Sequence, residues 1–446
     1  MPLTSGWLSR LGCRSGVLAQ APLALILLAL SAVAWWPRFV GLASPGADQV
    51  ASAFGIASLC QSDPTQLGWF GSAPVAAGAA SLFAPGLLQP LLSGFACRFS
   101  LASGMAPLQA YLVLGLLLTA VLSFLSCRWA GLRPDTSLLG SFLLVTAPCS
   151  FSRIGHLELA VLIPVIPSLV ACLQLHRCLL QPIAPLPLIG CGALAALLTF
   201  PSQDYYVAFS LLLLLASFAL ELLLASASTL ELAPLRKLVR RGGLFLLGFL
   251  LVLVLLFVPK LLALGLPVGG SSGLTGGPPV SWATPRLPNQ TFTYGLLPFT
   301  WVIPSPWVPV TLDALRSGWI DTNSESFFWS TGSLLIPISW ILAIRRLAMP
   351  AQRPRARASS AGGSTSGWRF GALQDGDRRF LALLLLLASA LGLLVMTMGG
   401  LGTLFAVFIS PVLRSLNRFT AFVYGASVLY LLADFDLWLQ RRAPNP

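Results

Sequence analysis

Long apolar runs bounded by arginine constrain this chain more than any other feature of its sequence. Between Arg241 and Lys260 no side chain is polar, and from Phe380 to Val395 the only polar side chain is that of Ser389. A transmembrane α-helix needs about 20 apolar residues to cross the hydrocarbon core of a bilayer. Only 9% of the residues are charged, whereas soluble domains carry about 25%. The runs therefore predict an all-α, polytopic integral membrane protein.

The spacing of these runs predicts about ten transmembrane helices, all within a single transmembrane domain that covers residues 1–446. The first span follows Arg10 and Arg14 and is expected to stay uncleaved, because tryptophans such as those at its far end are typical of membrane interfaces. The expected spans are residues 21–40, 107–127, 137–152, 159–176, 183–200, 205–226, 243–265, 328–345, 380–399 and 419–437.

The basic residues predict the orientation of the chain in the membrane. If the N-terminus is cytoplasmic, most of the 27 Lys and Arg residues fall in cytoplasmic segments, as the positive-inside rule requires. We therefore expect both termini in the cytoplasm. The net charge of +13 does not indicate nucleic-acid binding, because the basic residues lie in short loops between apolar runs instead of forming one stripe.

Three loops are long enough to carry structure or function. Residues 43–106 form an apolar external loop with many Gly and Pro. Such backbone cannot face lipid without hydrogen-bond partners, so we expect short interfacial or re-entrant helices there. Residues 265–327 form a second long external loop, and long loops are often functional. Residues 346–379 form a basic cytoplasmic loop whose Ser, Gly and Arg content is typical of a flexible linker.

The metal-binding residue types do not form a site. The eight Cys residues lack metal-site spacing, and the two His residues, His156 and His176, are expected on opposite faces of the membrane. No phosphate-binding or metalloprotease motif occurs, so neither a metal nor another cofactor is predicted. Cys60 and Cys97 fall in the same external loop, but their spacing alone does not decide whether they form a disulfide.

The candidate functional residues lie on the expected external face. Asp48 follows the first span, where a carboxylate is suited to act as a general base or, alternatively, to cap the next helix. Arg153, His156 and Glu158 share one external turn. An Arg beside a His is suited to bind phosphate oxygens. The alternative is a surface ion pair between Arg153 and Glu158.

Further candidates lie at the external ends of later spans. Asp204 and Tyr205 begin the sixth span, where an acid beside an aromatic ring suits a sugar, although Tyr is common at interfaces in any case. Arg414 and Arg418 are spaced i, i+4 and would repel each other on a helix unless an anion lies between them. Glu325 precedes the eighth span, where the helix dipole also favours a carboxylate.

Taken together, these segments resemble the bacterial polytopic membrane glycosyltransferases of the GT-C type. The resemblance covers residues from about 40 to 440. It rests on Ala47-Asp48 after the first span, Arg153-Ile154-Gly155-His156, the Tyr205-Tyr206 turn, Glu325 with its aromatic neighbours, and the run from Leu413 to Phe419.

The resemblance implies transfer of a sugar from a polyprenyl-phosphate donor at the external face of the bacterial inner membrane. By this resemblance Asp48 would activate the acceptor, and the donor phosphate would be bound by Arg153, His156, Arg414 and Arg418. Further substrate contacts would come from Glu158, Asp204, Tyr205 and Glu325. Besides the donor, the lipid bilayer is the expected partner, while the sequence does not indicate the acceptor, the sugar or the oligomeric state.

Two other functions are left open by the residues themselves. One is a transporter or flippase for a lipid-linked saccharide, which should carry polar residues near the middle of the bilayer. The other is a membrane protein without catalytic activity.

Overall fold

Helices make up all the secondary structure that the computed structural model describes. The described residues are 13–41, 88–152, 161–181, 183–199, 204–228, 232–265, 333–349, 373–395, 401 and 416–442. They form α2 (Cys13–Gly41), α5 (Leu88–Ser103), α6 (Pro107–Ala130), α7 (Pro134–Val145), α8 (Pro148–Ser152), α10 (Val165–Leu180), α11 (Pro185–Thr199), α12 (Asp204–Ser228), α13 (Leu232–Gly265), α17 (Leu335–Ala348), α18 (Asp375–Val395), the 3-10 helix η5 (Leu416–Phe419) and α20 (Thr420–Arg442).

The described helices are those of a multi-pass membrane protein. Six of them are long and apolar enough to cross a bilayer, namely α2, α6, α12, α13, α18 and α20. Every predicted span overlaps at least one described helix. The predicted number of about ten crossings is nevertheless not confirmed, because α7, α10, α11 and α17 have only 12, 16, 15 and 14 residues, fewer than the roughly 20 that span a hydrocarbon core.

The third predicted span, residues 137–152, is two helices instead of one. α7 ends at Val145, and α8 begins at Pro148. Proline has no N–H to continue a helix, and it disfavours helical backbone at the residue before it. A single continuous helix over this range was therefore the wrong expectation.

Some helices extend into the predicted loops. α13 begins at Leu232, well before the predicted start at residue 243, so the basic residues from Arg236 to Arg241 lie on a helix. α18 likewise begins at Asp375, inside the predicted loop 346–379. The predicted external loop 43–106 contains α5, whereas the loop 265–327 lies outside the described residues apart from Gly265, the last residue of α13. That α5 lies in the membrane interface stays a prediction.

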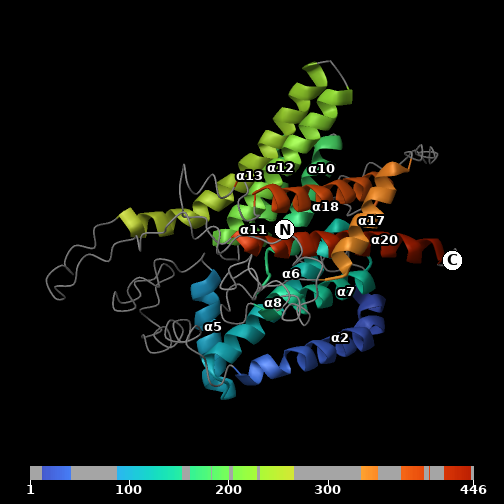
Figure 1. The fold of residues 1–446 in the computed structure, drawn as a ribbon. Coiled ribbons are helices and arrows are strands. Elements are labelled where there is room, and N and C mark those ends of the chain that lie inside the picture. Colours follow the sequence, from blue (N-terminus) through green and yellow to red (C-terminus); the bar gives the residue numbers. More distant parts are fainter. Residues whose placement is uncertain are drawn as a thin grey trace, which may run out of the picture.

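α10 lies at the centre of the bundle. All its residues except Arg177 and Leu180 are buried, and it contacts α6, α11, α12, α13, α18 and α20. From Val165 to Leu173 the only polar side chain is that of Ser168, and a helix that is apolar on every side is buried on every side in a stable fold. The packing of α10 therefore positions most of the other helices (Figure 1).

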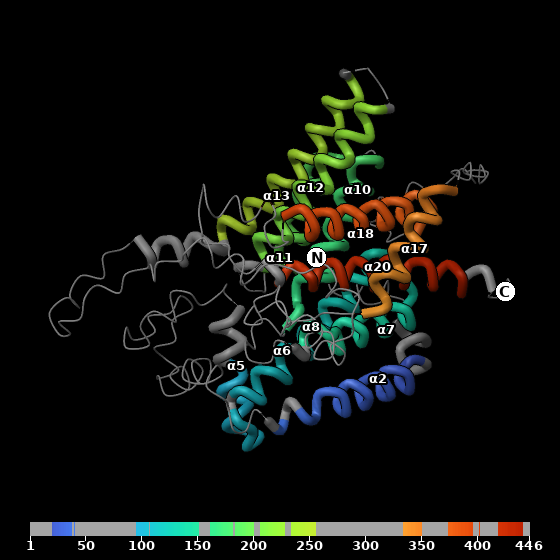
Figure 2. The backbone as a smooth tube through the Cα atoms, in the orientation of Figure 1, coloured from blue at the N-terminus to red at the C-terminus, as the bar shows by residue number. Residues whose placement is uncertain are grey.

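Hydrogen bonds between α7 and α20 define two ends of the bundle. Near the end of α20, the Asp436 carboxylate accepts a 2.9 Å hydrogen bond from Thr136 at the start of α7. Near the start of α20, the Tyr424 hydroxyl donates a 3.0 Å hydrogen bond to the Leu143 carbonyl. The two helices are therefore antiparallel. α2 begins at the same end of the bundle at which α20 finishes, on the right of Figure 2.

α11 and α13 pack backbone to backbone at two glycines. A Cβ added at Gly192 would lie 1.9 Å from the Phe245 carbonyl oxygen, and one added at Gly248 would lie 2.0 Å from that of Ile189. Because lipid is as apolar as the helices, close van der Waals packing between small residues drives helix association in membranes. These two glycines therefore set the distance between the two helices.

We predict that Gly192→Ala destabilises the protein, because the added methyl group forces α11 away from α13. Overpacking of this kind costs about 1–3 kcal/mol. Thermal unfolding in detergent should show a lower melting temperature. Gly190→Ala is the matched control on the same helix, since a Cβ at Gly190 meets no atom within 4 Å. Equal melting temperatures for the two variants would contradict the close contact.

Candidate functional site

The structure describes only part of the predicted external site. Asp204 and Tyr205 form the start of α12, and Arg418 lies in η5, where its side chain is partly exposed and interacts with the rest of the protein. The other predicted site residues lie outside the described residues; these are Asp48, Arg153, His156, Glu158, Glu325 and Arg414.

A cluster of buried aromatic rings joins the start of α12 to the start of α20. The Phe209 ring packs edge-to-face on Phe419 with centroids 5.4 Å apart. Tyr206 meets Phe422 at 6.0 Å, and Phe419 stacks on Phe422 at 5.5 Å. Such pairs add about 0.5–1.5 kcal/mol to the burial of each ring. We call this end of the bundle, with Tyr206, Phe209, Phe419 and Phe422, the aromatic end.

The cluster brings together two of the predicted pieces of the site. Asp204 and Tyr205 directly precede the buried Tyr206, and Arg418 directly precedes the buried Phe419. Because these rings pack within one cluster, the two backbone segments are fixed close to each other. The sequence alone did not indicate that these two segments are neighbours.

α10 begins at the same end. Its Ser168 hydroxyl lies 2.6 Å from the Ser210 hydroxyl of α12. A Cβ at Gly425 of α20 would lie 2.3 Å from Cγ1 of Val165, so α10 and α20 pack in close contact. Residues 153–158 connect the end of α8 to the stretch before α10. The Arg-His-Glu turn predicted from the sequence is therefore attached to the aromatic end.

The end of α2 is fixed at this end of the bundle too. The Trp35 indole donates a 3.0 Å hydrogen bond to the Val145 carbonyl at the end of α7. Trp35 packs in one buried cluster with Ala96 of α5 and Tyr111 of α6. A buried tryptophan ring normally needs a hydrogen-bond partner for its indole N–H, and the Val145 carbonyl is that partner here. The segment that carries Asp48 therefore leaves α2 at the aromatic end.

Cys97 of α5 is disulfide-bonded, with its partner outside the described side chains. That the partner is Cys60 stays a prediction. The remaining cysteines with described side chains are buried free thiols, namely Cys127, Cys149, Cys172, Cys178 and Cys191.

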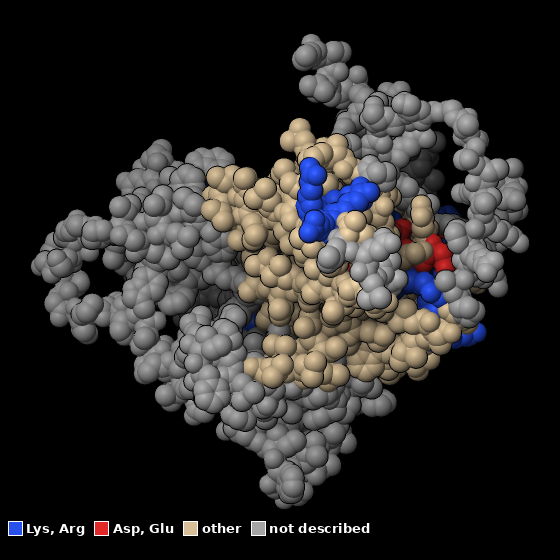
Figure 3. Space-filling view, turned by 90° about the horizontal axis from the view of Figure 1, so that it is seen from above, with Lys and Arg blue, Asp and Glu red and all other residues tan. Residues whose placement is uncertain are grey.

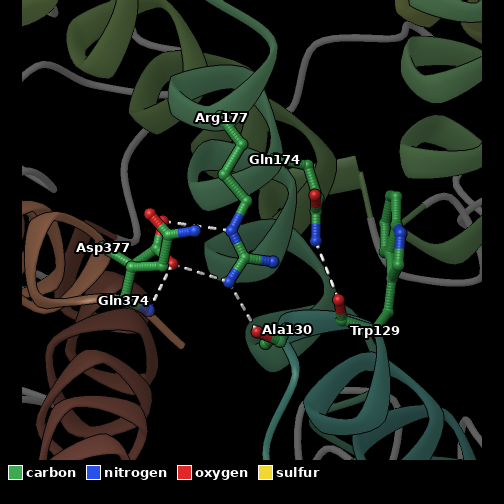
Figure 4. Close-up of polar contacts among 6 residues, drawn as sticks. All are labelled: Trp129, Ala130, Gln174, Arg177, Gln374 and Asp377. Carbon is green, nitrogen blue, oxygen red and sulfur yellow. Dashed lines mark hydrogen bonds and ion pairs between the residues drawn. The ribbon is translucent and has the colours of Figure 1, made fainter. Parts of the chain in front are cut away.

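The opposite end of the bundle is held by buried ion pairs, and we call it the ionic end. The Arg177 guanidinium binds the Asp377 carboxylate through two hydrogen bonds of 3.1 and 2.9 Å. It also donates to the Ala130 carbonyl, and the Asp377 carboxylate accepts from the Gln374 N–H (Figure 4). The two paired side chains are only 14% and 9% exposed. This pair connects α10 to α18 and to the end of α6.

A second buried pair at the ionic end joins α10 to α12. His176 Nδ1 lies 2.7 Å from Glu221 Oε1. The imidazole ring stacks on Phe380 of α18 with centroids 4.2 Å apart. The other ring nitrogen, Nε2, is buried and has no hydrogen-bond partner among the described residues. His176 of α10 therefore contacts both α12 and α18.

Asp436 caps the start of α7 from a different helix. α7 has no side-chain cap of its own at Arg133. The buried Asp436 carboxylate accepts from the Arg133 N–H at 3.2 Å and from the Thr136 hydroxyl at 2.9 Å. A negative charge at a helix N-terminus satisfies free N–H groups and is favoured by the helix dipole. This contact fixes the end of α20 against α7.

The structural roles of these buried acids were not predicted from the sequence. Acids on the predicted cytoplasmic side, such as Asp377, were expected to have no special role, yet Asp377, Glu221 and Asp436 are buried and bonded. Glu221 gave a signal, because a lone carboxylate inside an apolar run normally pairs within the bundle. The described part of the chain holds no group of three or more His, Cys, Asp or Glu that could bind a metal ion.

Comparison with known proteins gave no relative of this chain. No protein-family model, no curated protein and no solved structure matches it. The likeness to GT-C glycosyltransferases therefore rests on the residues quoted above.

We predict that Arg177→Ala is strongly destabilising, because it leaves Asp377 as an unpaired buried charge. Breaking such a pair costs about 3–5 kcal/mol. Arg133→Ala is the control: its partner Asp135 and Arg133 itself have side chains 32% and 42% exposed, and such pairs contribute under about 1 kcal/mol. Chemical denaturation in detergent measures both.

A double variant separates the ion pair from a simple packing defect. Arg177→Met combined with Asp377→Leu removes both charges and should recover most of the lost stability. If the double variant is no more stable than Arg177→Ala, the unpaired charge is not the cause of the loss.

Proposed function

We propose that this chain is a membrane glycosyltransferase similar to those of the GT-C type. It moves a sugar from a polyprenyl-phosphate donor to an acceptor at the external face of a bacterial inner membrane. The observation that carries the proposal is the convergence of four chain segments on the aromatic end, since these segments lead to most of the residues of the predicted site.

Chain geometry supports this convergence. Asp48 lies seven residues beyond Gly41, the last residue of α2, and seven residues span at most about 25 Å. Arg153 follows α8 directly, and Arg414 lies two residues before η5. The candidate base and the candidate phosphate ligands are thus tethered to one end of the bundle.

Two observations favour an external position for the aromatic end. Cys97 directly follows Ala96, which packs in the cluster with Trp35, and it is disulfide-bonded. Structural disulfides persist in oxidising compartments outside the cytoplasm. Most basic residues of the described helices lie at the other end, for example Arg128, Arg177 and Arg345, in agreement with the positive-inside rule. The proposed orientation puts the lipid-linked donor and the candidate base on the same side.

The proposed chemistry uses each side chain for one task. The Asp48 carboxylate takes the proton of an acceptor hydroxyl, and the hydroxyl oxygen forms a bond to the anomeric carbon of the sugar. The bond from that carbon to the lipid phosphate breaks, and its electron pair stays on the phosphate. Arg414 and Arg418 neutralise that phosphate together with Arg153. His156 donates a hydrogen bond to the same group.

The polar groups in the described membrane helices favour an enzyme over a transporter. The Thr119, Ser210 and Ser217 hydroxyls each bond to a carbonyl of their own helix. Of the buried ion pairs described above, Arg177–Asp377 lies close to helix termini, and His176–Glu221 lies four and seven residues from the ends of α10 and α12. A carrier is expected to place ionisable groups midway along its spans, and the described spans do not follow that pattern.

The direct test is transfer of a radiolabelled sugar from polyprenyl phosphate by the full chain in liposomes, with a bacterial envelope extract as acceptor. Asp48→Asn should lower the rate at least about 100-fold, because a general base contributes that much. Asp135→Asn at the ionic end is the control and should keep the rate. Transfer that survives in Asp48→Asn would remove the base from the proposal. Translocation of the donor without transfer would favour the flippase.

The orientation has its own test in the disulfide of Cys97. Two additional thiols should become reactive toward a maleimide when the denatured chain is reduced. Cys60→Ser should release the Cys97 thiol without reductant, which a gel shift with a large maleimide detects. Alkylation of Cys97 in the oxidised wild-type chain would contradict the disulfide, and release of Cys97 in Cys13→Ser instead would assign a different partner.

A further inference from the structure

We propose that the first turns of α13 bind the headgroups of anionic phospholipids. Arg236, Lys237 and Arg240 are exposed there, and together they form what we call the headgroup patch. Figure 3 looks down onto the tip of the α12–α13 hairpin and shows one group of Lys and Arg side chains without Asp or Glu among them, while a second group, on the right of the view, lies beside Asp and Glu. This inference is independent of the proposed glycosyl transfer.

The arrangement of charge in the headgroup patch calls for an anionic partner. Arg236 and Arg240 are spaced i, i+4, so they share one helix face and repel each other. Within the described part of the chain, the ion pairs do not include Arg236, Lys237 or Arg240. A bound anion would offset the repulsion among these positive charges.

The length of α13 puts the headgroup patch at the membrane surface. The helix has 34 residues and is therefore about 50 Å long, whereas the hydrocarbon core is about 30 Å thick. The apolar run from Gly242 to Pro259 fits that core. Arg241, just before this run, is fixed to the ionic end by a 3.0 Å hydrogen bond to the Leu179 carbonyl. Arg240, the patch residue nearest the hydrocarbon core, directly precedes Arg241. The headgroup patch therefore lies at the depth of lipid phosphates.

Apolar side chains around the patch favour a lipid over a soluble anion. Leu223 and Leu224 at the end of α12 are 66% and 44% exposed, and Val239 within the patch is 48% exposed. Basic side chains interleaved with exposed apolar ones are typical of the interface between headgroups and acyl chains. The aliphatic stems of Lys and Arg lie along such a surface while their charges reach the phosphates. A soluble acidic partner would leave the leucines in water.

The experiment measures lipid retention by the detergent-purified full chain in native mass spectrometry. The probes are phosphatidylglycerol and phosphatidylcholine. The triple variant R236Q/K237Q/R240Q should retain phosphatidylglycerol about tenfold less than the wild type, and rising salt should weaken the wild-type retention. The control R353Q/R355Q/R357Q removes the same charge from the basic loop and should behave like the wild type. Arg236→Lys with Arg240→Lys should preserve retention.

Three results would overturn the proposal. Equal loss in the triple variant and in the loop control would show that only net charge matters. Equal retention of phosphatidylcholine would exclude a headgroup preference. Complete displacement of the lipid by inorganic phosphate at equal concentration would indicate a site for free phosphate. The melting temperature of each variant in phosphatidylcholine alone should match that of the wild type, which separates lost binding from misfolding.

Discussion

The bidentate ion pair between Arg177 and Asp377 holds the helix on which the rest of the bundle packs. α10 is buried along almost its whole length, so its partners on every side depend on where it lies. Taking two charges out of water is costly, and their attraction offsets this cost only when geometry and further hydrogen bonds are good. Here the Ala130 carbonyl and the Gln374 N–H supply those additional bonds. The pair therefore fixes α10, α18 and the end of α6 in one arrangement.

The bilayer explains why polar chemistry is divided between the two ends. A span must satisfy its backbone groups internally, and a buried charge is tolerated only when it is paired. Hydroxyls such as those of Thr119, Ser210 and Ser217 accordingly bond to carbonyls of their own helices. The ion pairs gather at the ionic end, and the aromatic end closes with packed rings. This division leaves the loops of the aromatic end to carry the proposed transfer, and it leaves the exposed start of α13 to meet lipid headgroups.

The sequence predicts the helices of this fold well because each apolar run is long enough to form one. It fails at particular boundaries for physical reasons. Arg236 to Arg241 were interpreted as a loop, although a helix can continue beyond the hydrocarbon core without cost. The span over residues 137–152 was interpreted as one helix, although Pro148 ends the preceding turn. The shorter helices leave the number of crossings undetermined by length alone.

The site is predicted less completely than the fold. Asp204, Tyr205 and Arg418 were chosen from residue type and position, and the aromatic cluster brings their segments together. Hydropathy contains no information on which helix ends are neighbours, so this proximity was not predictable. The partner of Glu221 was likewise not predictable, because His176 is distant in the sequence. Asp48, Arg153, His156, Glu158, Glu325 and Arg414 stay predictions.

The central claim is that the aromatic end binds a lipid-linked phosphate on the external side of the membrane. The most direct measurement is a structure of the full chain in lipid nanodiscs with a polyprenyl-phosphate sugar bound. We predict phosphate density against Arg414 and Arg418, with the Asp48 carboxylate facing the anomeric carbon. Phosphate bound at the ionic end, or Asp48 turned away from the bound sugar, would contradict the claim.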